Sequence, residues 1–266
     1  MFAVAITELV GSVDAAAAAL APLLGKTPYD ARLELAAGVP AMVLTTTEMP
    51  RAVELAGQLR ALGHGVLAFD TAKVVASDDM IAMKRFRLEA DGLALDDRPG
   101  EKLPYDEVWA LVRAVHRFDS ETRAATETKQ LSPMRAIATG GLMMTKKVKG
   151  EARSLESARC GVLYLFRRTG KTPWILRETG TSYAGLGAEI GHSQVQNFGT
   201  TVRLLRERMP QTPFDERLVT MKRIRQGEAI SRPGISVESS TVPWTDLLAH
   251  VVAYSVSQRG VVPYRT

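Results

Sequence analysis

Residues 24–70 read LGKTPYDARLELAAGVPAMVLTTTEMPRAVELAGQLRALGHGVLAFD, and this stretch decides the fold expected for the first part of the chain. Thr27 followed by Pro28 predicts a helix start, because threonine caps a helix N-terminus and proline fits the first turn. Apolar side chains recur at helical spacing in two segments, and each segment ends at a glycine. Short apolar runs follow them at residues 41–45 and 65–69 and predict strands. The stretch therefore predicts helix, strand, helix, strand.

The residues before this stretch add one strand and one helix. Residues 2–9 form a short apolar run that is typical of a buried strand. Ser12 can cap the alanine-rich helix that follows, since its hydroxyl can accept a hydrogen bond from a free amide, and Gly25 ends that helix. Residues 1–78 are therefore expected to form a βααβαβ module.

Two short motifs carry a resemblance to a known family. Gly38-Val39-Pro40 precedes a strand, and residues 59–66 (LRALGHGV) end a helix with a leucine and a glycine before the last strand. With these motifs, residues 1–78 resemble the C-terminal domain of the bacterial ribosomal stalk protein. Related folds of this kind occur as adaptor modules outside ribosomes.

The resemblance implies a docking surface. The stalk family contacts translation factors through lysines on its second helix and on the helix that follows. This chain carries Tyr29, Asp30 and Arg32 where basic residues stand in that family. The resemblance implies that the module docks a protein partner with its second and third helices, through Tyr29, Arg32 and Arg51.

Residues 79–266 are predicted to form a mostly antiparallel β domain, so the fold class expected for the chain is α+β. Apolar runs predict strands at residues 83–88, 93–95, 160–166 and 173–177, and helical periodicity predicts two C-terminal helices at residues 195–209 and 244–258. Residues 103–115 fit a helix by spacing and a strand by β-branched content, and we interpret them as a strand.

Residues 119–157 show no sustained hydrophobic period. A loop of this length is uncommon inside a compact domain, so we expect a mobile insertion that a partner could order. Strands followed by one long helix make residues 80–215 weakly resemble a pleckstrin-homology-like barrel, in which a helix plugs one end.

Charge is distributed unevenly along the chain. Residues 1–78 hold five Lys/Arg and eight Asp/Glu, whereas residues 119–160 hold eight against five and residues 161–266 hold fourteen against eight. An acidic front and a basic rear could bind separate partners or each other. The predicted binding residues of the rear are the tip of a basic hairpin, Arg167, Arg168 and Lys171, and a lysine cluster in the insertion, Lys146, Lys147 and Lys149.

The sequence contains no residue spacing typical of a reactive centre. The histidines His64, His116, His192 and His250 have no metal-ligand spacing with one another or with Cys160. His64 stands between two glycines at a predicted helix end, where a positive charge suits the helix dipole, so we interpret it as a cap. His192 lies in a loop before a helix and is the best catalytic candidate of the four. Cys160 begins an apolar strand, where a buried inert thiol is expected.

Nucleotide and metal cofactors are not expected. Gly170-Lys171-Thr172 is similar to the end of a P-loop, but residue 165 is leucine where the P-loop requires glycine. A lone cysteine fits a reducing compartment, and no apolar run reaches the roughly 20 residues of a membrane-spanning helix. Together with the absence of a signal-peptide pattern, these features predict a cytoplasmic protein.

The leading hypothesis is a non-catalytic protein-binding adaptor that uses helix surfaces and a basic hairpin. One alternative is a nucleic-acid-associated protein that uses the basic C-terminal half. Another is an enzyme with a site near His192 or Cys160.

Overall fold

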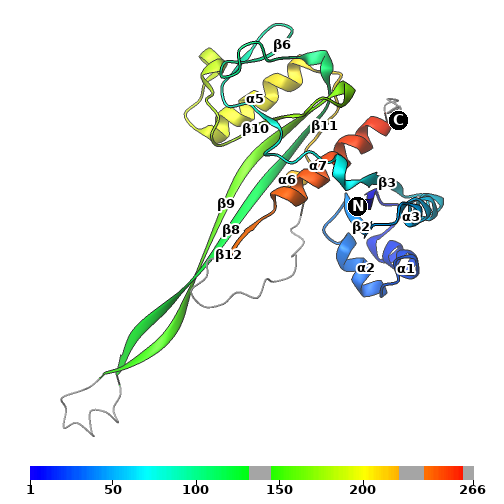
Figure 1. The fold of residues 1–266 in the computed structure, drawn as a ribbon, viewed down its shortest axis with the longest axis vertical. Coiled ribbons are helices and arrows are strands. Elements are labelled where there is room, and N and C mark those ends of the chain that lie inside the picture. The colour runs from blue at the N-terminus through cyan, green and yellow to red at the C-terminus, as the bar shows by residue number, and fades with distance from the viewer. Residues whose placement is uncertain (132–144, 222–236, 260–266) are drawn as a thin grey trace. The chain divides into compact units, whose positions relative to one another are not determined.

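The computed structural model describes residues 1–131, 145–221 and 237–259 (Figure 1). They form an α+β fold with mostly antiparallel sheets and a C-terminal helix, which confirms the predicted fold class. The described chain divides into two compact units. The first comprises residues 1–116, 160–221 and 242–259, and the second comprises residues 117–131, 145–159 and 237–241.

The first six elements follow the predicted βααβαβ order. They are β1 (Phe2–Glu8), α1 (Val13–Leu24), α2 (Pro28–Leu35), β2 (Ala41–Thr46), α3 (Met49–Ala61) and β3 (Gly65–Asp70). In their sheet, β1 lies between β2 and β3 and is antiparallel to both. The predicted caps are present, because Ser12 Oγ accepts a hydrogen bond from the Ala15 amide and Thr27 Oγ1 accepts one from the Asp30 amide.

The two faces of this sheet pack against different helices. Val4 and Ile6 of β1 belong to a hydrophobic core with Leu20 of α1, Leu35 of α2 and Leu59 of α3. Alternate residues of a strand point to opposite faces, so Ala5 faces the other way. There it packs with Leu67 and with Val251 of the C-terminal helix.

The remaining elements follow along the chain, and Figure 1 colours them by residue number. The strands are β4 (Ile81–Ala82), β5 (Phe86–Leu88), β6 (Gly92–Leu95), β7 (Lys102–Pro104), β8 (Val108–Leu131), β9 (Thr145–Arg167), β10 (Trp174–Arg177), β11 (Phe214–Asp215) and β12 (Val237–Ser240). The helices are α5 (Gln194–Arg208), α6 (Arg217–Thr220) and α7 (Val242–Arg259), and short 3₁₀ turns lie at Thr71–Lys73, Tyr105–Glu107, Arg168–Gly170 and Ala184–Glu189.

Two sheets and α5 enclose the main hydrophobic core of this region. One sheet has the order β5-β6-β7, and the other has the order β11-β8-β9-β10-β4 with β12 also paired to β8. Phe198, Val202 and Leu205 of α5 share a core with Leu93 of β6 and Leu163 of β9. The predicted helix over residues 195–209 is thus observed. The resemblance to a pleckstrin-homology-like barrel stays a prediction.

The segment interpreted as a mobile insertion, residues 119–157, differs from the expectation wherever it is described. β8 continues to Leu131, β9 begins at Thr145, and the two strands pair with each other. Residues 132–144 lie outside the described residues. Strand pairing uses backbone hydrogen bonds, so a segment without a hydrophobic period can still form paired strands. The hydrophobic period therefore gave no signal for these strands.

The C-terminal helix α7 packs on two sheets of the first unit. Val251 contacts the β2-β1-β3 sheet through Ala5 and Leu67, while Leu248 and Val252 share a core with residues of β8, β9 and β10. Residues 1–78 thus have their own sheet and core but are tied to the rest of the first unit by α7. The domain boundary at residue 78 stays a prediction.

Candidate functional site

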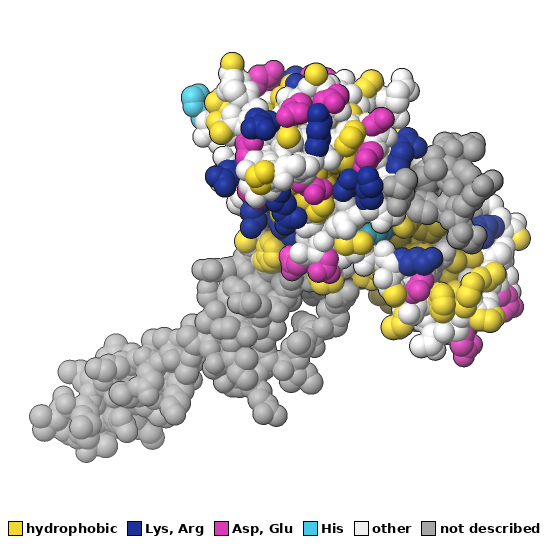
Figure 2. All heavy atoms as spheres, turned by 45° about the horizontal axis from the view of Figure 1, so that its top comes forward, with side chains coloured by type: hydrophobic (Ala, Val, Ile, Leu, Met, Phe, Trp, Pro, Cys, Tyr) yellow, Lys and Arg dark blue, Asp and Glu magenta, His cyan; other side chains and the backbone are white. Residues whose placement is uncertain are grey.

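Exposed apolar side chains occupy α2 and α3 of the N-terminal module. Tyr29 and Leu33 on α2 are 66% and 54% exposed, and Met49 and Val53 on α3 are 56% and 53% exposed. Each pair is spaced by four residues, so its two side chains lie on one face of their helix. Figure 2 shows hydrophobic side chains gathered on the surface of this module. These two helices are the ones that the sequence predicts to dock a partner, and we call these two exposed pairs, one on each helix, the apolar helix surface.

The two predicted arginines of the module have different surroundings. Arg32 Nε lies 2.8 Å from Asp14 Oδ1, an exposed ion pair. Arg51 lines a depression of about 270 Å³ between the end of α1 and α3, together with Leu24 and Glu54. Among the described residues Arg51 has no ion pair within 4.0 Å, so its charge is available to a ligand.

The predicted basic hairpin is present, but acidic residues neutralise part of it. β10 pairs antiparallel with β9, and the turn between them carries the predicted residues. Arg167 is only 8% exposed, and its Nη2 lies 3.0 Å from Glu107 Oε2. Lys171 Nζ lies 3.0 Å from Glu107 Oε1, and Arg168 Nε donates to the Asp106 carbonyl. Lys171 and then Arg167 lower the pKa of Glu107. Much of the expected positive charge is therefore paired within the fold.

The three predicted lysines of the insertion, Lys146, Lys147 and Lys149, lie on β9. The backbone is described there, and their side chains lie outside the description.

A buried polar network that the sequence analysis missed surrounds Asp246 of α7. Asp246 is 2% exposed, and its Oδ2 accepts a 2.7 Å hydrogen bond from the Ser77 amide. Its Oδ1 accepts hydrogen bonds from the Ser77 hydroxyl and, at 2.7 Å, from the Tyr164 hydroxyl. His116 Nε2 lies 2.7 Å from the Tyr164 oxygen and 3.6 Å from Asp246 Oδ1. The network joins α7 to β8, β9 and the segment after β3.

The electrostatics of the network favour an ionised Asp246. Burial opposes the charge, but the nearby His116 ring and the hydrogen bonds from Ser77 and Tyr164 outweigh burial and lower the pKa of Asp246. Burial and the Asp246 charge raise the pKa of Tyr164 well above its ordinary value. Ser77 is 1% exposed, and its hydroxyl donates to the Asp246 carboxylate. This arrangement fastens α7 in place.

His250, one turn after Asp246 on α7, is fixed in one neutral form. Its Nε2 accepts a hydrogen bond from the Val75 amide at 3.2 Å, so that nitrogen carries no proton. Its Nδ1 then donates to the Asp246 carbonyl at 2.8 Å. Burial lowers the pKa of His250.

His64 differs from the charged helix cap that the sequence suggested. It is 6% exposed, and its Nδ1 accepts a hydrogen bond from the Val10 amide at 3.1 Å. Burial lowers its pKa, which favours the neutral ring. The residue connects the end of α3 to the loop after β1 because a neutral imidazole nitrogen is a good acceptor.

The two catalytic candidates, Cys160 and His192, differ in exposure. Cys160 is buried, as expected, with its Sγ 3.2 Å from Thr179 Oγ1. His192 is exposed just before α5, where Ser193 Oγ caps the helix by accepting from the Gln196 amide. The structure does not bring these two side chains into one site with the network around Asp246.

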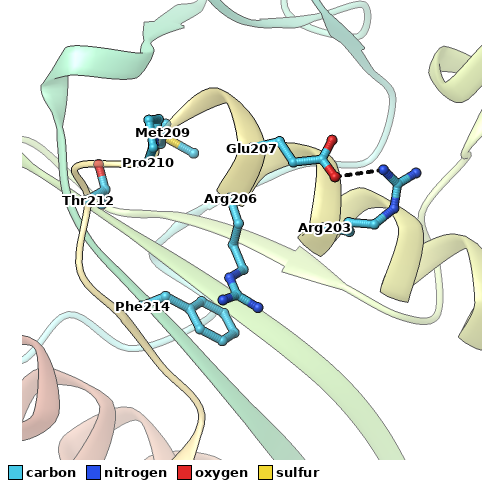
Figure 3. Close-up of a pocket in the computed structure, with 7 residues that line it drawn as sticks. All are labelled: Arg203, Arg206, Glu207, Met209, Pro210, Thr212 and Phe214. Carbon is cyan, nitrogen blue, oxygen red and sulfur yellow. Dashed lines mark hydrogen bonds and ion pairs between the residues drawn. The ribbon is translucent and has the colours of Figure 1, made fainter.

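A groove beside the C-terminal half of α5 is a second feature that sequence reasoning missed (Figure 3). It has a volume of about 610 Å³, and its lining residues are Arg203, Arg206, Glu207, Met209, Pro210, Thr212 and Phe214. The Arg206 guanidinium lies over the Phe214 ring at 4.3 Å from the ring centroid. Arg203 pairs with Glu207 at 2.8 Å and also with Glu189. The sequence predicted the arginines on the polar side of α5, but no sequence pattern indicated that Phe214 would lie against Arg206.

Comparisons with known proteins give no relative for this chain. No family model, no curated protein and no solved structure matches it.

In the described residues, no group of three or more His, Cys, Asp or Glu side chains could hold a metal ion. The described helices include none that is long and apolar enough to cross a membrane.

Proposed function

We propose that this protein is a non-catalytic adaptor of the cytoplasm that docks a protein partner on α2 and α3. The observation that carries the proposal is the apolar helix surface, where Tyr29, Leu33, Met49 and Val53 are each more than half exposed. Burial of such a side chain contributes about 1.5–3 kcal/mol, and a few apolar anchors supply most of the affinity of an interface.

Polar groups beside these side chains support a protein partner over a membrane or a small molecule. Arg51, Glu54 and Gln58 line the depression next to α3, and Asp14 with Arg32 forms an exposed pair near α2. Charges of both signs beside exposed apolar side chains are typical of the rim of a protein interface. The lone thiol Cys160 is buried and forms no disulfide, which is consistent with a reducing compartment.

Site-specific photo-crosslinking in the cells that express the chain tests this proposal. A benzophenone amino acid replaces Tyr29 or Val53, and Arg98 serves as an exposed control position outside the module. We expect one discrete crosslinked protein from the first two positions and none from the third. The further change Leu33→Ser should abolish the crosslink from position 29. A crosslink of equal yield from all three positions, or none from positions 29 and 53, contradicts the proposal.

The paired strands β8 and β9 favour a second candidate, nucleic-acid association. A two-stranded ribbon fits the major groove of duplex DNA, and residues 119–160 hold eight Lys/Arg against five Asp/Glu. Salt titration of binding to a labelled heterologous duplex tests it, since phosphate contacts make affinity fall steeply with salt. Changing Lys146, Lys147 and Lys149 to Gln should reduce the salt slope by about 0.9 per lost phosphate contact. The same change at Lys26, Lys73 and Lys84 is the charge-matched control, and equal slopes for both variants contradict this candidate.

A further inference from the structure

We propose that the groove between α5 and β11 binds an extended acidic peptide segment of a second protein, with a carboxylate on Arg206. The site is separate from the apolar helix surface of the N-terminal module, so it would give the chain a second partner.

The cation in the groove is held in place and unpaired. The Phe214 ring supports the Arg206 guanidinium from one side, and Figure 3 shows Arg206 reaching from α5 toward that ring. Within the described residues Arg206 has no carboxylate within 4.0 Å, whereas its neighbour Arg203 is engaged by Glu207 and Glu189. A stacked guanidinium keeps its in-plane N–H groups available, and these groups match the two oxygens of a carboxylate.

Part of the lining beside this cation is apolar, and the rest is Thr212 and the ion pair between Arg203 and Glu207. Met209 is 4% exposed at the end of α5, Pro210 follows it, and Phe214 lies opposite. A carboxylate with an adjacent aliphatic side chain complements a guanidinium with an adjacent apolar wall. A basic segment is disfavoured here, because it would bring a like charge against Arg206.

An unpaired strand edge favours a peptide over a free carboxylate. β11 ends the order β11-β8-β9-β10-β4, and no strand of the described residues pairs with its outer edge. Leu111 donates its amide to the Pro213 carbonyl, and Phe214 stands in register with Leu111. Because backbone groups alternate in direction along a strand, the N–H and C=O of Phe214 point away from β8. An extended peptide could bond to these groups, as in recognition by strand addition.

Fluorescence anisotropy with a defined probe tests the proposal on the full chain. The probe is a fluorescein-labelled peptide of alternating valine and glutamate, about ten residues long, within the usual length of a strand. We expect saturable binding, with affinity lowered about tenfold by Arg206→Gln, because a charge-assisted hydrogen bond is lost. Arg208→Gln is the matched control on the same helix, outside the groove lining, and should leave affinity unchanged. Phe214→Leu keeps an apolar residue but removes the ring under Arg206, so it should also weaken binding.

Modified probes separate the possible occupants. Replacing glutamate by lysine in the peptide should abolish binding, and N-methylation of alternate backbone amides should weaken it at least about tenfold by removing strand hydrogen bonds. No binding of the original peptide, or equal binding to wild type and Arg206→Gln, overturns the proposal. If free glutamate competes with the peptide at similar concentrations, the groove is a site for small carboxylates and the proposal is overturned. Concentration-dependent self-association that Arg206→Gln abolishes, without peptide binding, would assign the groove to a second copy of this chain.

Discussion

At the scale of single residues, Asp246 determines how α7 is held. Its two carboxylate oxygens accept hydrogen bonds from the Ser77 amide, the Ser77 hydroxyl and the Tyr164 hydroxyl, and all three residues are buried. A buried donor that loses its acceptor costs about 1–3 kcal/mol, more than the hydrogen bond itself contributes. The network is therefore a place where one substitution has a large effect.

We expect Asp246→Ala to lower the free energy of unfolding by about 2–4 kcal/mol, since two or more buried donors lose their acceptor. Urea denaturation at pH 7 measures the change. Asp78→Ala is the control, because the Asp78 carboxylate is 95% exposed and its ion pair with Arg177 should contribute less than about 1 kcal/mol. If the two variants lose equal free energy of unfolding, the buried network contributes no more stability than an exposed ion pair.

His250 makes stability depend on pH. Its folded pKa is lowered, so the unfolded chain binds the proton more readily, and stability falls as the pH drops below the ordinary value of about 6.5. The contribution of His250 is fully present above that pH and is lost as the pH falls toward the folded pKa. Protonation would also place a hydrogen on Nε2 facing the Val75 amide.

We expect His250→Gln to be less stable than wild type at pH 7.5 but to lose less stability between pH 7 and pH 5. Urea midpoints across this range give the two slopes. His64, whose pKa is also lowered by burial, is present in both proteins, so the difference between the slopes reports on His250 alone. Identical slopes would contradict the assignment of a neutral, buried His250.

Local chemistry was readable from the sequence at some residues and not at others. Ser12 and Thr27 were predicted as caps because a cap depends on neighbours within three positions. The pairing of Arg167 with Glu107 joins residues sixty positions apart, and no local pattern shows it. His64 was misread as a charged cap for the same reason, since its partner Val10 is 54 positions away.

At the scale of elements, α7 is the piece that ties the first unit together. One side of the helix packs on β1 and β3, and another packs on the sheet that contains β8, β9 and β10. Its periodic apolar residues predicted a helix, but a periodic pattern does not tell which surfaces a helix will cover. The apolar content on several sides of α7, including Leu248, Val251 and Val252, follows from packing against two sheets.

Truncation of a buried leucine tests the packing of α7. We expect Leu248→Ala to lower the free energy of unfolding by about 2–5 kcal/mol, because Leu248 is 4% exposed in a shared core. The matched control is Val195→Ala on α5, which is 64% exposed and should change stability by less than about 0.5 kcal/mol. Thermal or urea unfolding of both variants measures this, and a loss under about 1 kcal/mol for Leu248→Ala would show that α7 is weakly packed.

Some of the helices and strands could be predicted from their sequence, and others could not. The βααβαβ order of residues 1–70 was predictable, since α1 and α2 begin at capping side chains and each of the three helices has a glycine near its end. β8 and β9 beyond residue 118 were missed, because pairing through the backbone leaves no hydrophobic period in the sequence. The groove beside α5 was missed as well, since it depends on Phe214 folding back onto Arg206.

At the scale of the whole molecule, several of the potentially reactive side chains are buried and make contacts within the fold. Cys160, Ser77 and His116 are buried, and their described contacts fasten strands and α7 to one another. The surface offers the apolar helix surface and the groove at Arg206. Two such surfaces suit a protein that joins partners.

Calorimetric titration with the partner identified by photo-crosslinking tests the central claim most directly. The comparison is between wild type and one variant with Tyr29, Leu33, Met49 and Val53 all changed to Ser, after urea unfolding has shown equal stability. We predict that the variant binds at least about a hundredfold more weakly, which corresponds to two anchors of about 1–2 kcal/mol each. An affinity within about twofold of wild type would contradict docking on α2 and α3.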